Sequence, residues 1–123
     1  MVDTPVLFDT NILIDYLSSR PQARIELDRY SDRAISIITW MEVMVGSTTA
    51  DENSTRAFLL NFHTLALTPD VAERAFHVRR ARKIKLPDAV LQATAEVSGR
   101  TLVTRNTRDF PAGTAGVRIP YTI

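Results

Sequence analysis

Four acidic residues stand at places where a folded sheet would bring them together. Asp9, Glu42 and Asp109 each follow an apolar, strand-like stretch of the sequence. Asp88 comes directly after a proline, in the first turn of an expected helix, where the positive end of the helix dipole favours the ionised carboxylate. Clustered carboxylates repel one another, so their convergence requires a compensating cation. The four positions therefore predict a metal site.

The residue types select the metal. Carboxylate oxygens are hard ligands, and no Cys or His joins the set, which favours Mg²⁺ or Mn²⁺ over Zn²⁺. The chain has no cysteine, and its two histidines, His63 and His77, lie in other segments that we interpret as helical. Disulfides, thiolate metal sites and cysteine nucleophiles are thereby excluded.

Each acid alone also has a purely structural explanation. Asp9 would cap the helix that follows it, and Glu42 would close a capping box. Asp88 would complement a helix dipole, and Asn106 with Asp109 would form a turn. The metal-site hypothesis rests on the placement of all of them at one edge of one sheet.

Alternating strand-like and helix-like segments must position these residues. We expect buried strands over residues 5–8, 34–38, 64–67, 101–104 and 117–119. We expect helices over residues 11–17, from Pro21, from Thr39 to about Gly46, over 51–62, from Pro69, and from Pro87 to Gly99. Strands that alternate with helices predict an α/β fold with parallel pairing and helices on both faces of the sheet. In such sheets the ligand crevice lies beyond the carboxyl ends of the strands.

Size and composition set the outer limits. The chain has 123 residues, of which 45% are apolar, and its formal net charge is +1. This length suits one domain over residues 1–123, and the near-neutral charge means that any site for a polyanion must be local. The first residues lack the basic and apolar regions of a signal peptide, and no apolar run approaches the length of a membrane span, so we expect a cytoplasmic protein with no membrane contact.

Four short motifs, in this order and spacing, give the chain a resemblance to the PIN-domain nucleases, and most closely to the VapC-type toxins of bacterial toxin–antitoxin pairs. The motifs are Phe8-Asp9-Thr10-Asn11, Ile38-Thr39-Trp40-Met41-Glu42-Val43, Lys85-Leu86-Pro87-Asp88-Ala89, and Leu102-Val103-Thr104-Arg105-Asn106 with Asp109-Phe110. The resemblance covers nearly the whole length. It implies a three-layer α/β/α sandwich around a short parallel sheet of four to five strands.

The resemblance also implies a site and a reaction. Asp9, Glu42 and Asp88 would be ligands of Mg²⁺ or Mn²⁺, and Asp109 would be the fourth acid. Many PIN domains have an aspartate where this chain has Asn106, whose uncharged amide would instead orient a ligand. The reaction would be hydrolysis of an RNA phosphodiester by a metal-activated water, attacking in line and leaving a 5′-phosphate and a 3′-hydroxyl.

Polar neighbours complete the expected site. Thr10, Asn11 and Thr104 stand beside the acids and are candidate donors that orient the carboxylates, with ordinary helix and turn capping as the alternative. A basic stretch precedes Asp88 and would bind RNA phosphates, unless it is a solvated helix face. The basic residues of this stretch are Arg79, Arg80, Arg82, Lys83 and Lys85. Arg105 is a further candidate for RNA binding and has the same two interpretations.

Partners and rivals follow from the same comparison. The family resemblance implies a homodimer inhibited by an antitoxin protein. A phosphoacceptor receiver domain would place a Lys after its last main strand, where this chain has Thr104-Arg105, and a haloacid-dehalogenase-type phosphatase would have an aspartate in place of Asn11. A PIN fold that binds RNA or a partner without cleavage remains open as the alternative function.

Overall fold

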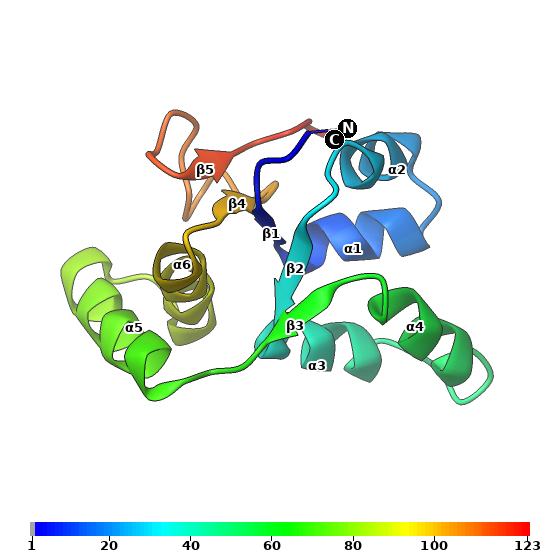
Figure 1. Ribbon diagram of the computed structural model, residues 1–123, viewed down its shortest axis with the longest axis horizontal. Helices are drawn as coiled ribbons and strands as arrows, with labels where there is room; N and C mark the ends of the chain where they lie inside the picture. The colour runs from blue at the N-terminus through cyan, green and yellow to red at the C-terminus, as the bar shows by residue number, and fades with distance from the viewer. Residues whose placement is uncertain (1) are drawn as a thin grey trace.

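A five-stranded parallel sheet runs through the centre of the protein in the strand order β3-β2-β1-β4-β5 (Figure 1). The computed structural model describes residues 2–123. The strands are β1 (Val6–Phe8), β2 (Arg33–Ser36), β3 (His63–Leu65), β4 (Thr101–Val103) and β5 (Val117–Arg118). The helices are α1 (Thr10–Leu17), α2 (Pro21–Asp28), α3 (Ile37–Val45), α4 (Glu52–Leu59), α5 (Pro69–Arg82) and α6 (Leu86–Ser98). The expected three-layer α/β/α sandwich with a parallel sheet is confirmed.

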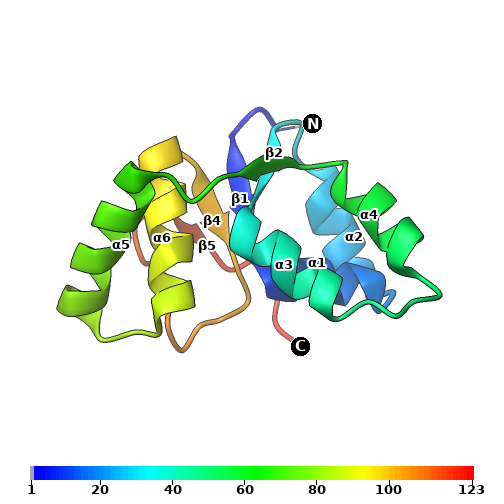
Figure 2. The same cartoon turned by 90° about the horizontal axis from the view of Figure 1, so that it is seen from below.

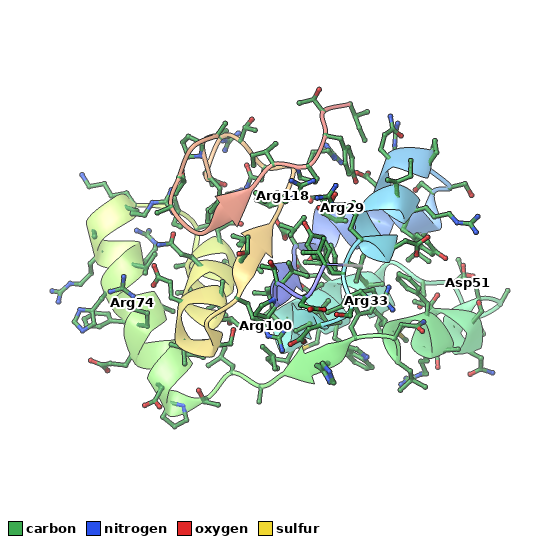
Figure 3. The ribbon with its side chains drawn as sticks, turned by 45° about the horizontal axis from the view of Figure 1, so that its top comes forward. Arg29, Arg33, Asp51, Arg74, Arg100 and Arg118 are labelled. Carbon is green, nitrogen blue, oxygen red and sulfur yellow. The ribbon has the colours of Figure 1, made fainter. Side chains whose placement is uncertain are left out.

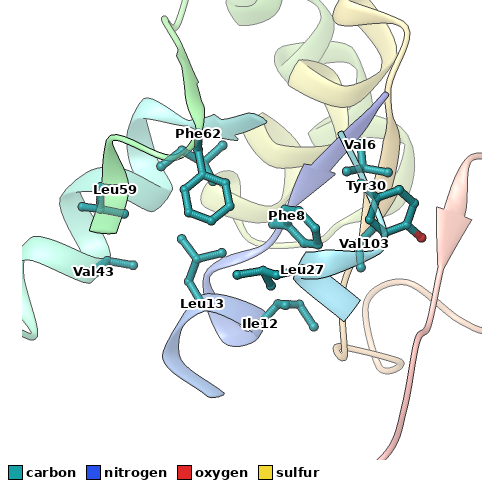
Figure 4. Packing of buried hydrophobic residues seen from close by; sticks show 11 residues of the cluster. Val6, Phe8, Ile12, Leu13, Leu27, Tyr30, Val43, Leu59, Phe62 and Val103 are labelled. Atoms are coloured by element: carbon teal, nitrogen blue, oxygen red, sulfur yellow. The ribbon is translucent and has the colours of Figure 1, made fainter. Parts of the chain in front are cut away.

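Strand β1 divides the core between the two faces of the sheet. Val6 and Phe8 point into a large cluster with residues of α1, α2, α3 and α4, whereas Leu7 points into a cluster with Leu91 and Ala95 of α6. Figure 2 shows these two groups of helices on opposite sides of the sheet, and Figure 4 shows Phe8 packed within the larger cluster. All three β1 side chains are fully buried, so the strand that ends at Asp9 is held from both faces.

Two arginines link strands of the sheet to neighbouring elements. Arg100 donates to the Val6 carbonyl at 3.1 Å and to Asp32 Oδ1 at 2.8 Å. Arg118 of β5 donates to both oxygens of the buried Glu26 of α2 at 2.7 and 3.0 Å. Arg100 and Arg118 are labelled in Figure 3. Arg100 thus links the starts of β1 and β2, whereas Arg118, which pairs with Val103 at the carboxyl end of β4, links β5 to α2.

Helix α3 begins earlier than its sequence pattern predicts. The expected strand over 34–38 ends at Ser36, whose hydroxyl accepts a hydrogen bond from the Ile38 amide at 3.0 Å and caps the helix. Thr39 lies inside the helix and is buried. The expected helix start at Thr39 with a Thr39–Glu42 capping box is therefore wrong. The isoleucine-rich run favours a strand locally, and tertiary packing overrides that preference.

Smaller differences concern β3 and the helix before it. The expected helix over 51–62 is shorter, and β3 spans His63–Leu65 rather than residues 64–67. His63, interpreted as a helical residue, is an exposed residue of this strand.

Gly99, expected just past the end of a helix, follows α6 with a φ of 67°. Among residues 2–123, the helices are too short or too polar to cross a lipid bilayer.

Candidate metal site and nucleic-acid cleft

Three of the predicted acids line one cleft at the carboxyl ends of the central strands. Asp9 caps α1 after β1, Glu42 lies on α3 after β2, and Asp88 lies in the first turn of α6. The cleft has a volume of about 410 Å³ and is also lined by Thr10, Asn11, Ile14, Ser36, Ile38, Thr39, Pro87, Leu91, Arg105 and Asn106.

Asp9 is the most firmly held of these acids. Its Oδ1 accepts from the Thr10 amide at 2.7 Å, and its Oδ2 accepts from the Thr104 hydroxyl at 2.7 Å and from Asn11 Nδ2 at 3.2 Å. Burial raises the pKa of Asp9 and the charge of Glu42 adds to the rise, while the hydrogen bonds oppose it. Thr10, Asn11 and Thr104 therefore all contact the Asp9 carboxylate, and their role in orienting a metal ligand stays a prediction.

Thr10 joins two of the acids. Its amide binds Asp9, and its hydroxyl donates to Glu42 Oε1 at 2.7 Å. The hydroxyl of the buried Thr39 lies 3.1 Å from the Thr10 hydroxyl, within hydrogen-bond distance. Glu42 itself is exposed, so Thr10 is what holds its carboxylate toward the cleft.

Asp88 and Asp109 form the second acidic pair. Burial, the charge of Asp109 and the charge of Asp9 raise the pKa of Asp88 to about 6, in that order of size. Asp109 Oδ2 accepts from Asn106 Nδ2 at 2.9 Å, and the Asp109 amide donates to Asn106 Oδ1 at 3.2 Å. Asn106 lines the cleft, and its side-chain amide donates to the Asp109 carboxylate. Among the neighbouring charges, that of Asp109 has the largest effect on the pKa of Asp88.

The donor set suits a hard divalent cation that retains water. Within residues 2–123, no three His, Asp or Glu side chains lie close enough together to ligate one ion directly. Mg²⁺ commonly keeps several waters and binds proteins through one or two carboxylates, so this open arrangement of oxygen donors fits it. Burial and repulsion from the neighbouring carboxylates raise the pKa of Asp88, and a bound cation would offset both effects.

The predicted RNA-binding residues divide into two groups. Arg79, Arg80, Lys83 and Lys85 are exposed at the end of α5 and in the turn before α6. Arg82 is not available in this way, because its guanidinium donates to Gln92 Oε1 and to the Asp109 carbonyl. Its expected role as an RNA contact is not supported by these contacts.

Arg105 lines the cleft and forms an ion pair with Asp15 of α1. Its Nε and Nη2 donate to the carboxylate of Asp15 at 2.7 and 3.0 Å, and its amide donates to Asn11 Oδ1 at 3.2 Å. The Tyr121 hydroxyl donates to the same Asp15 carboxylate at 2.8 Å. Sequence reasoning missed Asp15 and Tyr121. The one signal was an acid within the apolar run of α1, where Asp15 is 4% exposed.

Comparisons with known proteins agree with this geometry. A family model described as "PIN domain" matches residues 6–113. Ribonuclease VapC10 of Mycobacterium tuberculosis is 29% identical over 114 residues, which cover 86% of each chain.

Solved structures extend the likeness. A toxin–antitoxin complex from Klebsiella pneumoniae contains a chain that is 48% identical, with a TM-score of 0.91 and coverage of 96% of this chain and 99% of that chain. A chain of FitAcB from Neisseria gonorrhoeae is 26% identical, with a TM-score of 0.76 and coverage of 94% of this chain and 97% of that one. These similarities cover almost the full length on both sides.

Proposed function

Since the chain belongs to the PIN-domain family, we propose that it is a Mg²⁺- or Mn²⁺-dependent endoribonuclease and the toxin of a toxin–antitoxin pair. The observation that carries the proposal is the convergence of Asp9, Glu42 and Asp88, from three separate elements, on one cleft. The similarity to Ribonuclease VapC10 and to a chain of the Klebsiella complex supports the activity and the partner. The whole of residues 1–123 would act as one PIN domain in the cytoplasm, where its RNA substrate is found.

Asp9, Glu42 and Asp88 would hold the metal, and Asp109 would act with Asp88 as the fourth acid. When bound, the divalent cation lowers the pKa of a water and stabilises the leaving oxygen. The chain's own residues orient that chemistry: Thr104 and the Thr10 amide fix the Asp9 carboxylate, and the Thr10 hydroxyl fixes Glu42. No protein side chain needs to act as the nucleophile.

The basic residues beside the cleft would bind the RNA backbone. Arg105 turns Nε and Nη2 toward Asp15, which leaves Nη1 for a phosphate at the mouth of the cleft. Lys83 and Lys85 lie in the turn that leads into the first turn of α6, where Asp88 lies. Arg79 and Arg80, one turn earlier on α5, would extend this phosphate-binding surface.

The antitoxin and a second copy of the chain would use apolar surface. Ile14 and Leu17 of α1 are 40% and 43% exposed, and both line a groove formed with α3 and the segment from Ser47 to Thr55. Val45 at the end of α3 is 85% exposed. We propose the groove as the antitoxin contact, in line with the toxin–antitoxin complex that the chain resembles. We also propose that the protein is a homodimer.

A PIN fold that binds RNA or a partner without cleaving is the second candidate. The observation in its favour is that no three acidic or histidine side chains within residues 2–123 are close enough for direct joint ligation of an ion. RNA cleavage assays with and without metal separate the two functions.

The first test replaces Asp88 with Asn. D88N keeps the shape of the side chain but removes a negative charge that the metal needs, so we expect Mg²⁺- or Mn²⁺-dependent RNA cleavage to fall by about a thousandfold, close to what is seen when EDTA is added to the wild type. Cleavage rates of a labelled RNA and circular dichroism of both proteins provide the measurement.

Asp70 supplies a matched control. Like Asp88, it follows a proline in the first turn of a helix, but it lies on α5 and is exposed. D70N removes the same helix-dipole contact and should cleave at the wild-type rate. A folded D88N protein that cleaves as fast as D70N would contradict the assignment, and a wild type that binds RNA without cleaving it in Mg²⁺ or Mn²⁺ would favour the second candidate.

A further inference from the structure

Arg82, the last residue of α5, makes contacts with two other elements at once. Its guanidinium donates to Gln92 Oε1 on α6 and to the backbone carbonyl of Asp109. Its Cζ also lies 5.4 Å from the centre of the Phe110 ring. One side chain therefore connects the helix that carries Asp88 to the loop that carries Asp109.

The other contacts of that loop are either internal or made by Phe110 at its far end. The Asn106 side chain bonds the Asp109 carboxylate and amide, and the Phe110 amide donates to the Asn106 carbonyl at 3.0 Å, so these contacts shape the loop internally. Phe110 is fully buried against Leu91 and Ala95 of α6, which anchors the loop at its far end. Arg82 adds the directional contact, because a guanidinium binds in a plane with fixed donor directions.

We propose that Arg82 is a positioning residue that sets the distance between the Asp109 and Asp88 carboxylates. The inference rests on the proposed function in assigning these acids to one metal site. Arg82 touches neither carboxylate, so it acts through the Asp109 backbone and through Gln92.

The geometry accounts for an arginine at this position. Two donors in one plane reach an amide oxygen and a carbonyl oxygen while the flat face of the group covers an aromatic ring. A lysine has a single ammonium and no flat face, so it cannot make all three contacts. We therefore expect Arg82→Lys to behave like Arg82→Gln.

Arg74 is a matched control on the same helix. It also links α5 to α6, through Glu96 at 2.5 Å, but it makes no contact with the 106–110 loop among the hydrogen bonds and ion pairs of residues 2–123. It is labelled on α5 in Figure 3. R74Q therefore removes a helix–helix contact of the same kind without reaching Asp109.

The experiment compares R82Q with R74Q in the full chain. We expect R82Q to speed hydrogen exchange of the Asp109 and Phe110 amides in metal-free protein and to weaken Mn²⁺ binding by about tenfold, with a similar loss in kcat. R74Q should change none of these. In a D109N background R82Q should weaken Mn²⁺ binding no further, because the carboxylate that it positions is already gone.

Several outcomes would overturn the inference. They are loop exchange in R82Q equal to that in R74Q, faster exchange with unchanged Mn²⁺ affinity, or additive effects of R82Q and D109N. A wild type that binds Mn²⁺ but cleaves no RNA would contradict the proposed function and leave the inference to stand on exchange and affinity. A wild type that binds no Mn²⁺ would overturn both the metal site and the role of Arg82 within it.

Discussion

At Asp88, burial and the charge of neighbouring carboxylates act in the same direction. Both effects disfavour its ionised form, and its pKa rises to about 6. Asp9 shifts in the same direction, but three hydrogen bonds to its carboxylate counteract the shift. The two carboxylates therefore differ: protein donors stabilise the ionised form of Asp9, whereas for Asp88 we propose that a cation does so.

This difference gives the metal-free protein a characteristic pH dependence. Asp88 loses its proton near 3.8 when unfolded and near 6 when folded, so ionisation favours the unfolded state. The free energy of unfolding should fall by about 1 kcal/mol, after allowance for solvent screening, as pH rises from about 4 to about 6. Urea unfolding in EDTA measures it, with D88N as the reference that lacks this contribution.

Parallel pH curves for the wild type and D88N would show that the Asp88 pKa is not raised in solution. Mg²⁺ should oppose this fall in the free energy of unfolding, because the cation binds the ionised form of Asp88. Its affinity should fall as pH drops through 6.

At the scale of elements, the ends of helices carry the site. Asp9 is the N-cap of α1, and Asp88 lies in the first turn of α6. Capping and metal binding are compatible for Asp9, because Oδ1 accepts from the Thr10 amide while Oδ2 accepts from Thr104 and Asn11. Glu42 is different: it lies well inside α3 and caps nothing, since Ser36 provides that cap.

The end of α6 supplies a stability prediction that leaves the site untouched. Gly99 has a φ of 67°, and a Cβ built there meets no atom within 4 Å, so G99A suffers from backbone strain alone. The left-handed conformation should cost about 1 kcal/mol of unfolding free energy in G99A. Denaturant unfolding measures this loss, and kcat should not change.

Gly46 is the matched control for this substitution. It also ends a helix, but its φ is −76°, which any residue adopts. G46A should therefore cost less than G99A. Equal losses for the two variants would mean that the left-handed backbone at position 99 is not the cause.

At the scale of the whole molecule, the distribution of charged residues matters more than the net charge. The net charge is only +1, yet Lys83 and Lys85, the two lysines of the chain, both lie in the turn beside the cleft. Several arginines elsewhere form ion pairs: Arg100 pairs with Asp32 and Arg118 with Glu26. RNA attraction would thus come from a local surface.

The salt dependence of RNA binding tests this arrangement. K83Q/K85Q should lower the slope of log affinity against log salt by about 1.4 for a single-stranded RNA, because two phosphate contacts are lost. Binding is measured in a D88N background to prevent cleavage. R24Q/R74Q removes two charges from other exposed positions, and an equal change of slope in that variant would rule out a local phosphate-binding surface.

Local patterns were enough for the architecture and for the main acids. The alternation of strands and helices, the helix starts at Asp9 and Asp88 and the end at Gly99 depend on residues a few positions apart. Such signals can be identified from the sequence without knowledge of tertiary contacts. Parallel pairing then brings strand ends to one edge whatever the details of packing, which is why three acids could be placed in one cleft.

Tertiary structure alone decided which charged groups pair. Arg105 meets Asp15 from 90 residues away, and Arg82 reaches the Asp109 carbonyl 27 residues on, so both basic side chains expected to face RNA have partners within the chain. The start of α3 at Ser36 was decided in the same way. The physical reason is that pairing and burial depend on distances between side chains in space, and packing sets those distances.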